Sequence, residues 1–354
     1  MYNWRIVKCV CGLNILIGLI LIFPMERFFL LRYTKKVAVI YIATGNYVVF
    51  WDNFYKSAEK NFLPDTDKHY FLISDQAFDK LPDNVTYVYH PHKEWPSITV
   101  EKFDIIYSLK GKLQDYTYTY FFNANAWFIQ PIEGDILPSK TQKIIAGLHP
   151  NYYKTDDEYP YCSDKDSPAY LKQDENSKYY QACIMGGITE DFLKMAETIE
   201  QWKNMDLKRN YIPIWHDESY FNKYISDKNP LVLTPNYLWG SFPSKEAYDS
   251  FKNQVKIVMI DKDKTNNEGM DYFRDIRFVN DNPESLSEFF YVSYQNGGTD
   301  CISFHDNHFY TKTDDKSGEF TQENDTYKFI YSTGEKKCFK EIARSSFFYE
   351  IKCP

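Results

Sequence analysis

The stretch KKVAVIYIATGN, residues 35–46, decides the fold class of this 354-residue chain. Residues 37–43 form an unbroken apolar run, and a Thr-Gly-Asn turn signal follows it at once. An apolar run of this length that ends in a turn is typical of a strand buried on both faces. Such strands belong to parallel sheets that helices cover on both sides. The stretch therefore predicts the first strand of an α/β domain.

Downstream of this strand, helical and strand-like patterns alternate. Residues 47–62 repeat apolar side chains at three- and four-residue steps, which predicts an amphipathic helix. Further strand-like runs occupy 69–74, 85–90, 118–123 and 143–148, and further helical patterns occupy 100–113, 190–202 and 215–225. The alternation predicts a mostly parallel α/β sheet.

The two ends of the chain differ from this pattern. Residues 9–23 are apolar and uncharged and have no small-x-small cleavage site after them, which predicts an uncleaved signal anchor. After about residue 275, short β-like runs alternate with polar turns. The predicted organisation is a tail (1–8), a transmembrane anchor (9–23), a stem (24–35), the α/β domain (36–275) and a β-rich region (276–354). We expect a single-pass type II membrane protein, in the Golgi or secretory pathway of a eukaryote or membrane-associated in a bacterium.

The composition of the chain limits the classes of partner and modification to be expected. The chain is 44% hydrophobic and 25% charged, as globular proteins are, and its net charge of −8 without a basic stripe argues against nucleic acid. No CxxC pair is present, so a zinc site is not expected. Cys301, Cys338 and Cys353 lie close together, and we expect one disulfide among them. Sequons at Asn84 and Asn324 would make the chain a glycoprotein in a eukaryotic host.

The segment YFFNANAWF, residues 120–128, ends a predicted strand in polar residues. Ligands of open α/β sheets bind beyond the carboxyl ends of the strands. On an extended segment Asn123 and Asn125 would project to one side, into that crevice. Their amides bind divalent metals poorly but can donate to ribose or phosphate oxygens. The alternative is that asparagine only ends the strand in a turn.

Two more segments can carry chemistry. WHDES, residues 215–219, combines a tryptophan wall, a histidine donor and two carboxylates, although acidic residues there could simply cap a helix. YYQACIMGG, residues 179–187, ends in Gly186 and Gly187. These glycines allow a ligand to approach the main chain, or two backbones to pack closely.

Taken together and in this order, the motifs resemble glycosyltransferase family 6, the retaining α-1,3-galactosyl- and N-acetylgalactosaminyltransferases. The matching segments are ATGNYVVFWDNFYKSAEKNF (43–62), YFFNAN (120–125), LHPNYY (148–153), YYQACIMGG (179–187), WHDESYFNKY (215–224) and LTPNYLW (233–239). The resemblance covers most of residues 36–265 and does not extend to the β-rich region.

The resemblance implies a GT-A fold that uses a UDP-sugar. It assigns donor and nucleotide binding to Ile42, Ala43, Tyr47, Lys102, Asn123, Asn125 and Lys262. It assigns the donor-sugar pocket to Gln181, Ala182 and Cys183, and acceptor binding to His149, Trp215, His216 and Asp217. Glu218 would be the catalytic nucleophile or charge stabiliser. A further family arginine has no clean match, because Glu268 falls near its place and Arg274 or Arg277 could substitute only by rearrangement.

The same resemblance implies a cofactor and partners. Bacterial members with NxN in place of DxD are described as metal-independent, so we expect no bound metal, and Lys262 and Lys102 would offset the charge on UDP. The expected donor is UDP-galactose or UDP-N-acetylgalactosamine, and Ala182 and Cys183 favour galactose. The expected acceptor is an oligosaccharide or glycolipid. A sugar-binding pseudoenzyme and a metal-dependent transferase with other ligands remain as alternatives.

Overall fold

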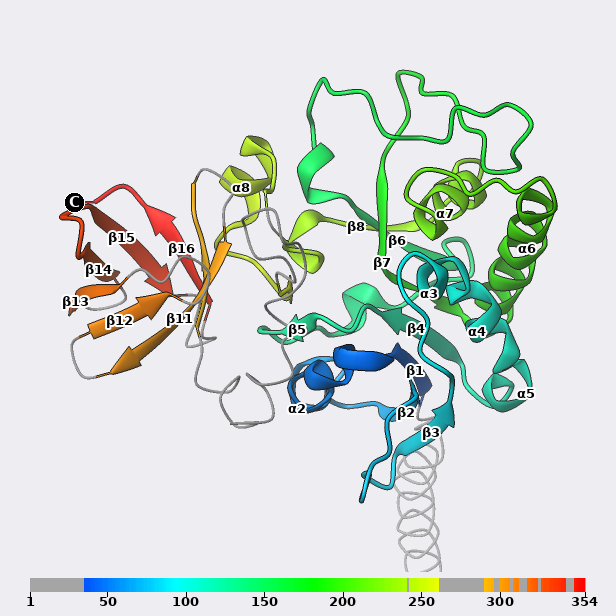
Figure 1. Cartoon of the computed structure of the whole chain (residues 1–354), viewed down its shortest axis with the longest axis horizontal. Coiled ribbons are helices and arrows are strands. Elements are labelled where there is room, and N and C mark those ends of the chain that lie inside the picture. Colours follow the sequence, from blue (N-terminus) through cyan, green and yellow to red (C-terminus); the bar gives the residue numbers. More distant parts are fainter. Residues whose placement is uncertain are drawn as a thin grey trace, which may run out of the picture. The chain divides into compact units, whose positions relative to one another are not determined.

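The computed structural model describes residues 35–240, 242–260, 290–295, 299–305, 308–311, 317–323, 326–341 and 347–353. Contacts divide the chain into Met1–Lys35 and Lys36–Pro354. The second unit contains an α/β region up to residue 260 and a β-barrel from residue 290 (Figure 1). The predicted anchor at 9–23 and the predicted boundary at 275 lie outside the described residues. None of the helices that the structure does describe is long and apolar enough to cross a bilayer.

The α/β region is built on one seven-stranded sheet with the strand order β3-β2-β1-β4-β7-β6-β8. The strands are β1 (Lys36–Ile42), β2 (Asp67–Ser74), β3 (Val85–Tyr89), β4 (Tyr118–Phe122), β6 (Ile144–Leu148), β7 (Tyr180–Ile188) and β8 (Leu231–Leu233). Within this sheet β7 alone runs antiparallel to its neighbours. The predicted mostly parallel sheet is confirmed, and the arrangement fits the GT-A fold.

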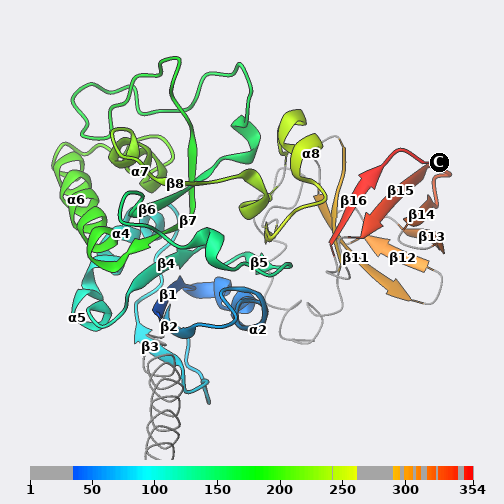
Figure 2. The ribbon, with the colours of Figure 1, turned by 180° about the vertical axis from the view of Figure 1, so that it is seen from behind.

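Alternation along β1 explains why its apolar run is unbroken. Val37, Val39 and Tyr41 pack into one hydrophobic core, whereas Ala38 and Ile40 pack into a second core on the opposite face. The first core is covered by a 3-10 turn (Gly45–Phe50) and α2 (Trp51–Asn61). The second is covered by α4 (Lys102–Ser108), α6 (Thr189–Lys208) and α7 (Asp217–Ile225). Figures 1 and 2 show α4, α6 and α7 together on one side of the sheet.

The helix predicted at 100–113 is interrupted. Its place is taken by α3 (Ser97–Val100), α4 and α5 (Lys110–Leu113). Glu101 and Leu109, at the two junctions, have ψ angles of −1° and 0°, which depart from the regular α-helical value of about −42°. Phe103, Ile106 and Leu113 are nevertheless buried, as their spacing predicts.

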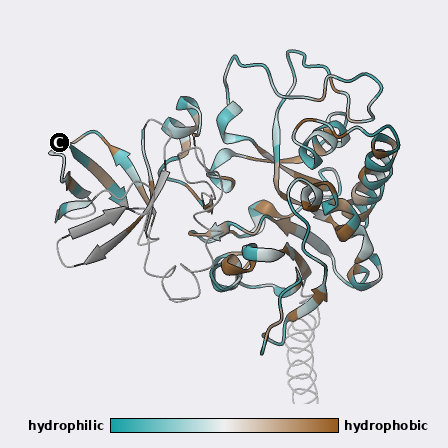
Figure 3. Ribbon diagram, in the orientation of Figure 1, coloured by the Kyte–Doolittle hydropathy of each residue, from teal (hydrophilic) through white to brown (hydrophobic). Residues whose placement is uncertain are grey.

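A small second sheet brings the end of the α/β region beside the asparagine segment. It pairs β5 (Ala126–Phe128) with β9 (Ile257–Met259) in antiparallel fashion. The remaining short helices are 3-10 turns at Gly134–Ile136, Pro150–Tyr152 and Pro235–Tyr237, and α8 (Lys245–Phe251). Residues 149–178, between β6 and β7, form a long and largely hydrophilic loop (Figure 3).

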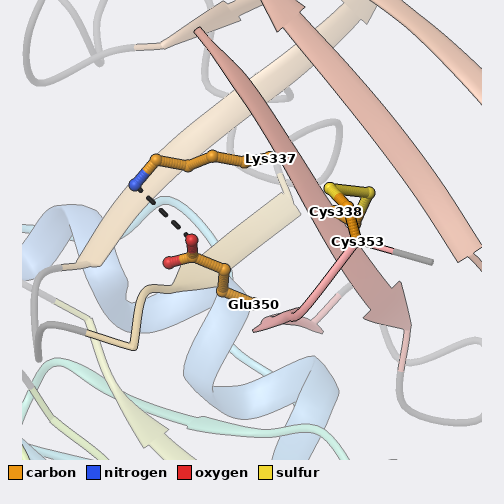
Figure 4. Close-up of a disulfide and its surroundings, with 4 residues drawn as sticks. All are labelled: Lys337, Cys338, Glu350 and Cys353. Carbon is orange, nitrogen blue, oxygen red and sulfur yellow. Dashed lines mark ion pairs between the residues drawn. A yellow bond between two sulfur atoms is a disulfide. The ribbon is translucent and has the colours of Figure 1, made fainter.

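The β-rich region is a closed barrel. Its strands are β10 (Phe290–Ser293), β11 (Thr299–His305), β12 (His308–Thr311), β13 (Ser317–Glu323), β14 (Thr326–Tyr331), β15 (Lys336–Glu341) and β16 (Phe347–Ile351). Parallel pairing of β10 with β16 closes it. The predicted disulfide joins Cys338 to Cys353, near an ion pair between Lys337 and Glu350 (Figure 4).

The barrel contacts the α/β region through buried side chains. Trp239 donates its indole N–H to Ser293 Oγ over 3.2 Å, and Tyr248 donates its hydroxyl to the Glu350 carbonyl over 2.8 Å. Tyr349 packs against the same small hydrophobic cluster. The barrel therefore adjoins the segment that runs from Trp239 through α8.

Candidate active site

A cavity of about 1360 Å³ lies beyond the carboxyl ends of β1 and β4. Predicted site residues that line it are Ile42, Tyr47, Lys102, Asn123, Asn125, His149, Gln181, Ala182, Cys183, Trp215, His216, Asp217 and Glu218. Lys262 lies outside the described residues, as do Glu268, Arg274 and Arg277. Segments far apart in the sequence thus meet at one edge of the sheet.

Ala43 does not line the cavity. It continues the alternation of Val37, Val39 and Tyr41, so its side chain falls on the core face and is fully buried. Its main-chain N–H donates to the Ile73 carbonyl over 2.9 Å. Ala43 therefore contributes to the sheet and its core, and the neighbouring Ile42 lines the cavity.

The asparagine segment is a tight turn, not an extended strand. The Ala126 N–H donates to the Asn123 carbonyl over 3.0 Å, so the chain reverses directly after β4. The expectation that Asn123 and Asn125 share one face of an extended segment is wrong for that reason. Both residues nevertheless line the cavity. The segment is therefore both a turn that ends the strand and part of the cavity lining.

Asn125 is tied to the end of β9 by two hydrogen bonds. Its side-chain N–H donates to the Ile260 carbonyl over 2.6 Å, and the Ile260 N–H donates to the Asn125 carbonyl over 2.9 Å. This fixes the amide orientation and leaves the buried oxygen Oδ1 without a partner in the described part of the chain. An oxygen accepts hydrogen bonds but cannot donate to phosphate. Asn123 is then the asparagine whose amide remains available to an anionic group.

The predicted donor-sugar triplet lies in a bulge of β7. Gly147 of β6 pairs with Gln181, and the preceding Ala146 pairs with Met185, so the intervening β7 residues have no partners on β6. Bulges of this kind redirect side chains beside active sites. Ala182 and Cys183 pack into the two opposite cores, whereas Gln181 is half-buried and its Oε1 has no partner among the described residues. Gln181 is therefore the triplet member that is not fully buried.

Gly186 and Gly187 serve close packing. A Cβ atom on Gly186 would approach the Thr119 carbonyl oxygen to 3.0 Å, and one on Gly187 would approach the Lys143 carbonyl oxygen to 2.7 Å. Neither glycine lines the cavity. Close approach of neighbouring strands, and not access for a ligand, explains both positions.

The Glu218 carboxylate is held by two donors. Tyr179 donates its hydroxyl to Oε1 over 2.7 Å, and the Ala182 N–H donates to Oε2 over 2.8 Å. Burial raises the pKa of Glu218 to about 7, against the lowering effect of these two hydrogen bonds. Glu218 lines the cavity. A ligand there would therefore meet a carboxyl group whose pKa is near neutral pH.

Lys102 and Asp217 form a buried ion pair at the cavity floor. Lys102 also donates to the Ala182 carbonyl over 3.1 Å, and its ammonium lies 4.8 Å from the centre of the Phe121 ring. Its charge is therefore matched within the protein. This placement argues against Lys102 as the main cation for a diphosphate.

The carboxylates of WHDES do not cap α7. His216 is the N-cap residue, and no side chain there bonds the first turn. Asp217 instead pairs with Lys102, and Glu218 bonds Tyr179 and Ala182. Trp215 and His216 have φ angles of +57° and +51°, which side-chain-bearing residues rarely adopt. Backbone strain of this type concentrates at functional sites.

His149 presents one defined tautomer to the cavity. Its Nδ1 accepts the Asn151 N–H over 3.2 Å, so the ring proton resides on Nε2. Burial lowers the pKa of His149 to about 4, which keeps the ring neutral. The neutral ring can therefore donate one hydrogen bond to a ligand hydroxyl.

Sequence analysis did not single out Tyr179, Trp95 or Phe242. Tyr179 stands among aromatic rings contributed by residues 149–178, including Tyr152, Tyr159 and Tyr161. Trp95 and Phe242 line the cavity and are largely exposed. The sequence offered one signal for Trp95. It lies in the polar segment HKEWPS, where no apolar periodicity assigns it to a core.

Comparison with known proteins identifies the family. The family model described as "Glycosyltransferase family 6" matches residues 25–267. The chain belongs to glycosyltransferase family 6. Membership of this family implies a nucleotide-sugar donor and a carbohydrate acceptor.

Individual relatives agree with the family match. The O-antigen biosynthesis glycosyltransferase WbnI of Escherichia coli is 33% identical over 231 residues, covering 64% of this chain and 95% of the relative. The histo-blood group ABO system transferase 2 of Rattus norvegicus is 25% identical, covering 66% and 71%. The globoside alpha-1,3-N-acetylgalactosaminyltransferase 1 of Homo sapiens is 24% identical, covering 64% and 67%. The family match ends at residue 267, before the first strand of the barrel at Phe290.

Proposed function

We propose that this family 6 member is a retaining glycosyltransferase that moves galactose or N-acetylgalactosamine from a UDP-sugar to a carbohydrate acceptor in α-1,3 linkage. The observation that carries the proposal is the Glu218 carboxylate, held by Tyr179 and Ala182 and open to the large cavity. The name of the human globoside alpha-1,3-N-acetylgalactosaminyltransferase 1 supports the α-1,3 linkage and one of the two proposed sugars.

Glu218 acts on the anomeric carbon in this proposal. Cleavage of the bond to UDP leaves oxocarbenium character on the sugar, which a carboxylate stabilises. Glu218 either attacks that carbon or stabilises a front-face ion pair while the acceptor hydroxyl enters. Both routes require the ionised carboxylate, and its two hydrogen bonds hold it in a fixed orientation. His149 would donate from Nε2 to an acceptor hydroxyl.

We further propose that the diphosphate is neutralised without a metal. The turn beyond β4 offers amides where a metal site would offer carboxylates, and Asn125 uses its N–H to hold Ile260. Because Asp217 already pairs with Lys102, the proposed cation is Lys262, two residues beyond Ile260. Asn123 would donate its amide to a phosphate or ribose oxygen.

Donor choice is assigned to Gln181. All three residues of the triplet line the cavity, but Ala182 and Cys183 are buried, whereas Gln181 is half-buried and carries the largest side chain of the three. Its bulk leaves less room for an N-acetyl group than a small residue would. The proposed donor is therefore UDP-galactose in preference to UDP-N-acetylgalactosamine.

The test combines metal removal with substitution at Glu218. Transfer from UDP-galactose to a saccharide acceptor is measured in EDTA and in Mn²⁺, and NMR of the product gives its anomeric configuration. We expect an α-linked product, equal rates in both conditions, and a loss of about 100-fold or more in Glu218→Gln. Glu190→Gln, on the exposed start of α6, is the matched control.

The alternatives give different results. A rate that collapses in EDTA and returns with Mn²⁺ indicates a metal-dependent transferase. Binding of UDP-sugars without turnover in any condition indicates a pseudoenzyme. Full activity in Glu218→Gln would overturn the assigned role of this carboxylate.

A further inference from the structure

Hydrogen bonds join the barrel to the α/β region at side chains that water does not reach. Trp239 and Ser293, the last residue of β10, have no exposed surface, and the Trp239 indole N–H donates to Ser293 Oγ. Tyr248 of α8 is buried and donates its hydroxyl to the main-chain carbonyl of Glu350 in β16. A buried polar group that loses its partner cannot bond water instead, so these contacts oppose movement of the barrel.

Glu350, the acceptor on the barrel side, is itself held in place. Lys337 forms an ion pair with its Oε1 over 3.7 Å, and the Gln295 N–H donates to its Oε2 over 3.0 Å. Three residues after Glu350, the disulfide from Cys353 to Cys338 joins the end of the chain to β15 (Figure 4). The barrel therefore offers a fixed acceptor to the α/β region.

Trp239 carries this attachment to the cavity through its main chain. The Trp239 N–H donates to the Ile257 carbonyl over 3.0 Å, and the Met259 N–H donates to the Trp239 carbonyl over 2.6 Å. Trp239 thus flanks β9 on the side away from β5. Ile260, directly after β9, makes the two main-chain and amide bonds with Asn125 described above. Met259, Ile260 and Asn125 all line the cavity.

A hydrophobic cluster at the same junction adds packing to the hydrogen bonds. Trp239 lies in one buried cluster with Val258 of β9 and Ile129, the residue after β5. Tyr349 of β16 packs against that cluster from the barrel. The barrel is therefore not only tethered by the chain, because it packs against the cluster that joins the two strands of the small sheet.

We propose that the barrel braces one side of the cavity. Through Ser293 and Glu350 it holds Trp239 and β9, and thereby the turn that carries Asn123 and Asn125. Ser293 and Glu350 are not among the lining residues of the cavity, so they act as positioning residues. The inference rests on the proposed function where it assigns this side of the cavity to the donor diphosphate. Because the family match ends at residue 267, the brace adds to what family membership implies.

The test uses two small deletions in the full chain. Ser293→Ala removes the acceptor of the Trp239 indole N–H, and Tyr248→Phe removes the hydroxyl that reaches Glu350. Hydrogen–deuterium exchange reports how firmly β9 is held. Calorimetry with UDP gives its affinity, and steady-state kinetics give kcat and the KM values for UDP-galactose and for a saccharide acceptor.

We expect the effects of both variants to be confined to one side of the cavity. The main-chain N–H groups of Met259 and Ile260 should exchange roughly threefold to tenfold faster than in the native chain, whereas exchange in β1 and β2 should not change. The Kd of UDP and the KM for UDP-galactose should rise by roughly threefold to tenfold, with kcat and the acceptor KM changed by less than about twofold. A loss of stability alone would lower kcat through a smaller folded fraction and leave both KM values in place.

The matched control is Ser332→Ala, in the exposed turn after β14, which should alter neither exchange nor affinity. An unchanged Kd and KM in Ser293→Ala, in a chain that binds UDP, would overturn the inference. So would faster exchange that extends equally over β1 and β2. If the native chain binds no UDP-sugar, the proposed function fails and exchange alone decides. Faster exchange confined to β9 then upholds the brace, and unchanged exchange overturns it.

Discussion

Tyr179 donates its hydroxyl proton to Oε1 of Glu218 across 2.7 Å. The second donor is the main-chain N–H of Ala182, in the bulge of the strand that Tyr179 precedes. One short stretch of chain therefore orients both carboxylate oxygens. Tyr179 is a positioning residue for the group on which the proposed chemistry depends.

Substitution of Tyr179 by Phe should move the acid limb of activity to higher pH. The hydroxyl stabilises the ionised form of Glu218, so its loss raises a pKa that burial already brings to about 7. We expect the pH profile of kcat/KM to shift upward by about one unit, with a loss of roughly tenfold at pH 6 and little loss at pH 9.

Tyr161→Phe is the matched control for that shift. It removes a hydroxyl from the same aromatic group, but this hydroxyl donates to the Lys178 carbonyl and does not reach Glu218. The acid limb should stay in place. An unshifted limb in Tyr179→Phe, or an equal shift in both variants, would refute the positioning role.

Glu218 should also impose a pH-dependent stability cost. Its folded pKa is about 7 against an ordinary value of 4.5, so between these values the folded state binds more protons than the unfolded state. Stability therefore falls as pH rises through this window, and the penalty remains above it. Glu218→Gln should be more stable than the native chain by about 1–3 kcal/mol at pH 8, and the difference should vanish below pH 4.5. Urea unfolding at both pH values, with Glu190→Gln as control, measures this difference.

The Lys102–Asp217 pair should behave as a buried ion pair whose members depend on each other. Lys102→Met leaves the Asp217 carboxylate buried without a cation and the Ala182 carbonyl without its donor. Breaking such a pair costs about 3–5 kcal/mol. Adding Asp217→Asn should recover part of that loss, because the uncompensated charge is removed. Denaturant unfolding of both single variants and the double variant gives the coupling energy, and simple additivity would contradict the pairing.

Asn125 should be irreplaceable by aspartate even when metal is supplied. A carboxylate there cannot donate to the Ile260 carbonyl and would face it in a buried setting. We expect Asn125→Asp to lose about 1–3 kcal/mol of stability, with no recovery in Mn²⁺. Asn123→Asp, at a partly exposed position whose main-chain N–H keeps its bond to Cys183, should retain its stability. Equal melting temperatures for the two variants would show that the Ile260 contact is not structural.

Sequence analysis predicted the features that depend on residues close together in the chain. The unbroken apolar run of β1 follows from burial on both faces, and the end of that strand marks one edge of the cavity. Asn123 was placed at the same edge because ligands of such sheets bind there, whereas Glu218 was assigned through the resemblance to family 6, and both line the cavity. The turn after β4, closed by a local hydrogen bond between Ala126 and Asn123, was one of the two alternatives that the sequence left open. The contact of Asn125 with Ile260 could not be predicted, because Ile260 follows β9, a segment far along the chain.

The features that sequence analysis missed depend on contacts between residues far apart in the chain. Lys102 finds Asp217 across 115 residues, and nothing near Lys102 in the sequence indicates that its charge is already matched. The bulge in β7 arises from its register with β6, and closure of the barrel arises from pairing of β10 with β16. Ala43 was assigned to the site by position alone, although the alternation of β1 places its side chain in the core.

Gly187 should not tolerate a side chain, even though it lies outside the cavity. A Cβ atom there would stand 2.7 Å from the Lys143 carbonyl oxygen, a main-chain atom that cannot move without shifting β6. We expect Gly187→Ala to cost about 1–3 kcal/mol by overpacking. Gly111→Ala, in α5 with no atom within 4 Å of the new Cβ, should instead be neutral or stabilise by up to about 1 kcal/mol. Urea unfolding compares the two variants, and equal stability would mean that β6 and β7 can separate without loss. Such a result would weaken the conclusion that Gly186 and Gly187 serve the close approach of neighbouring strands.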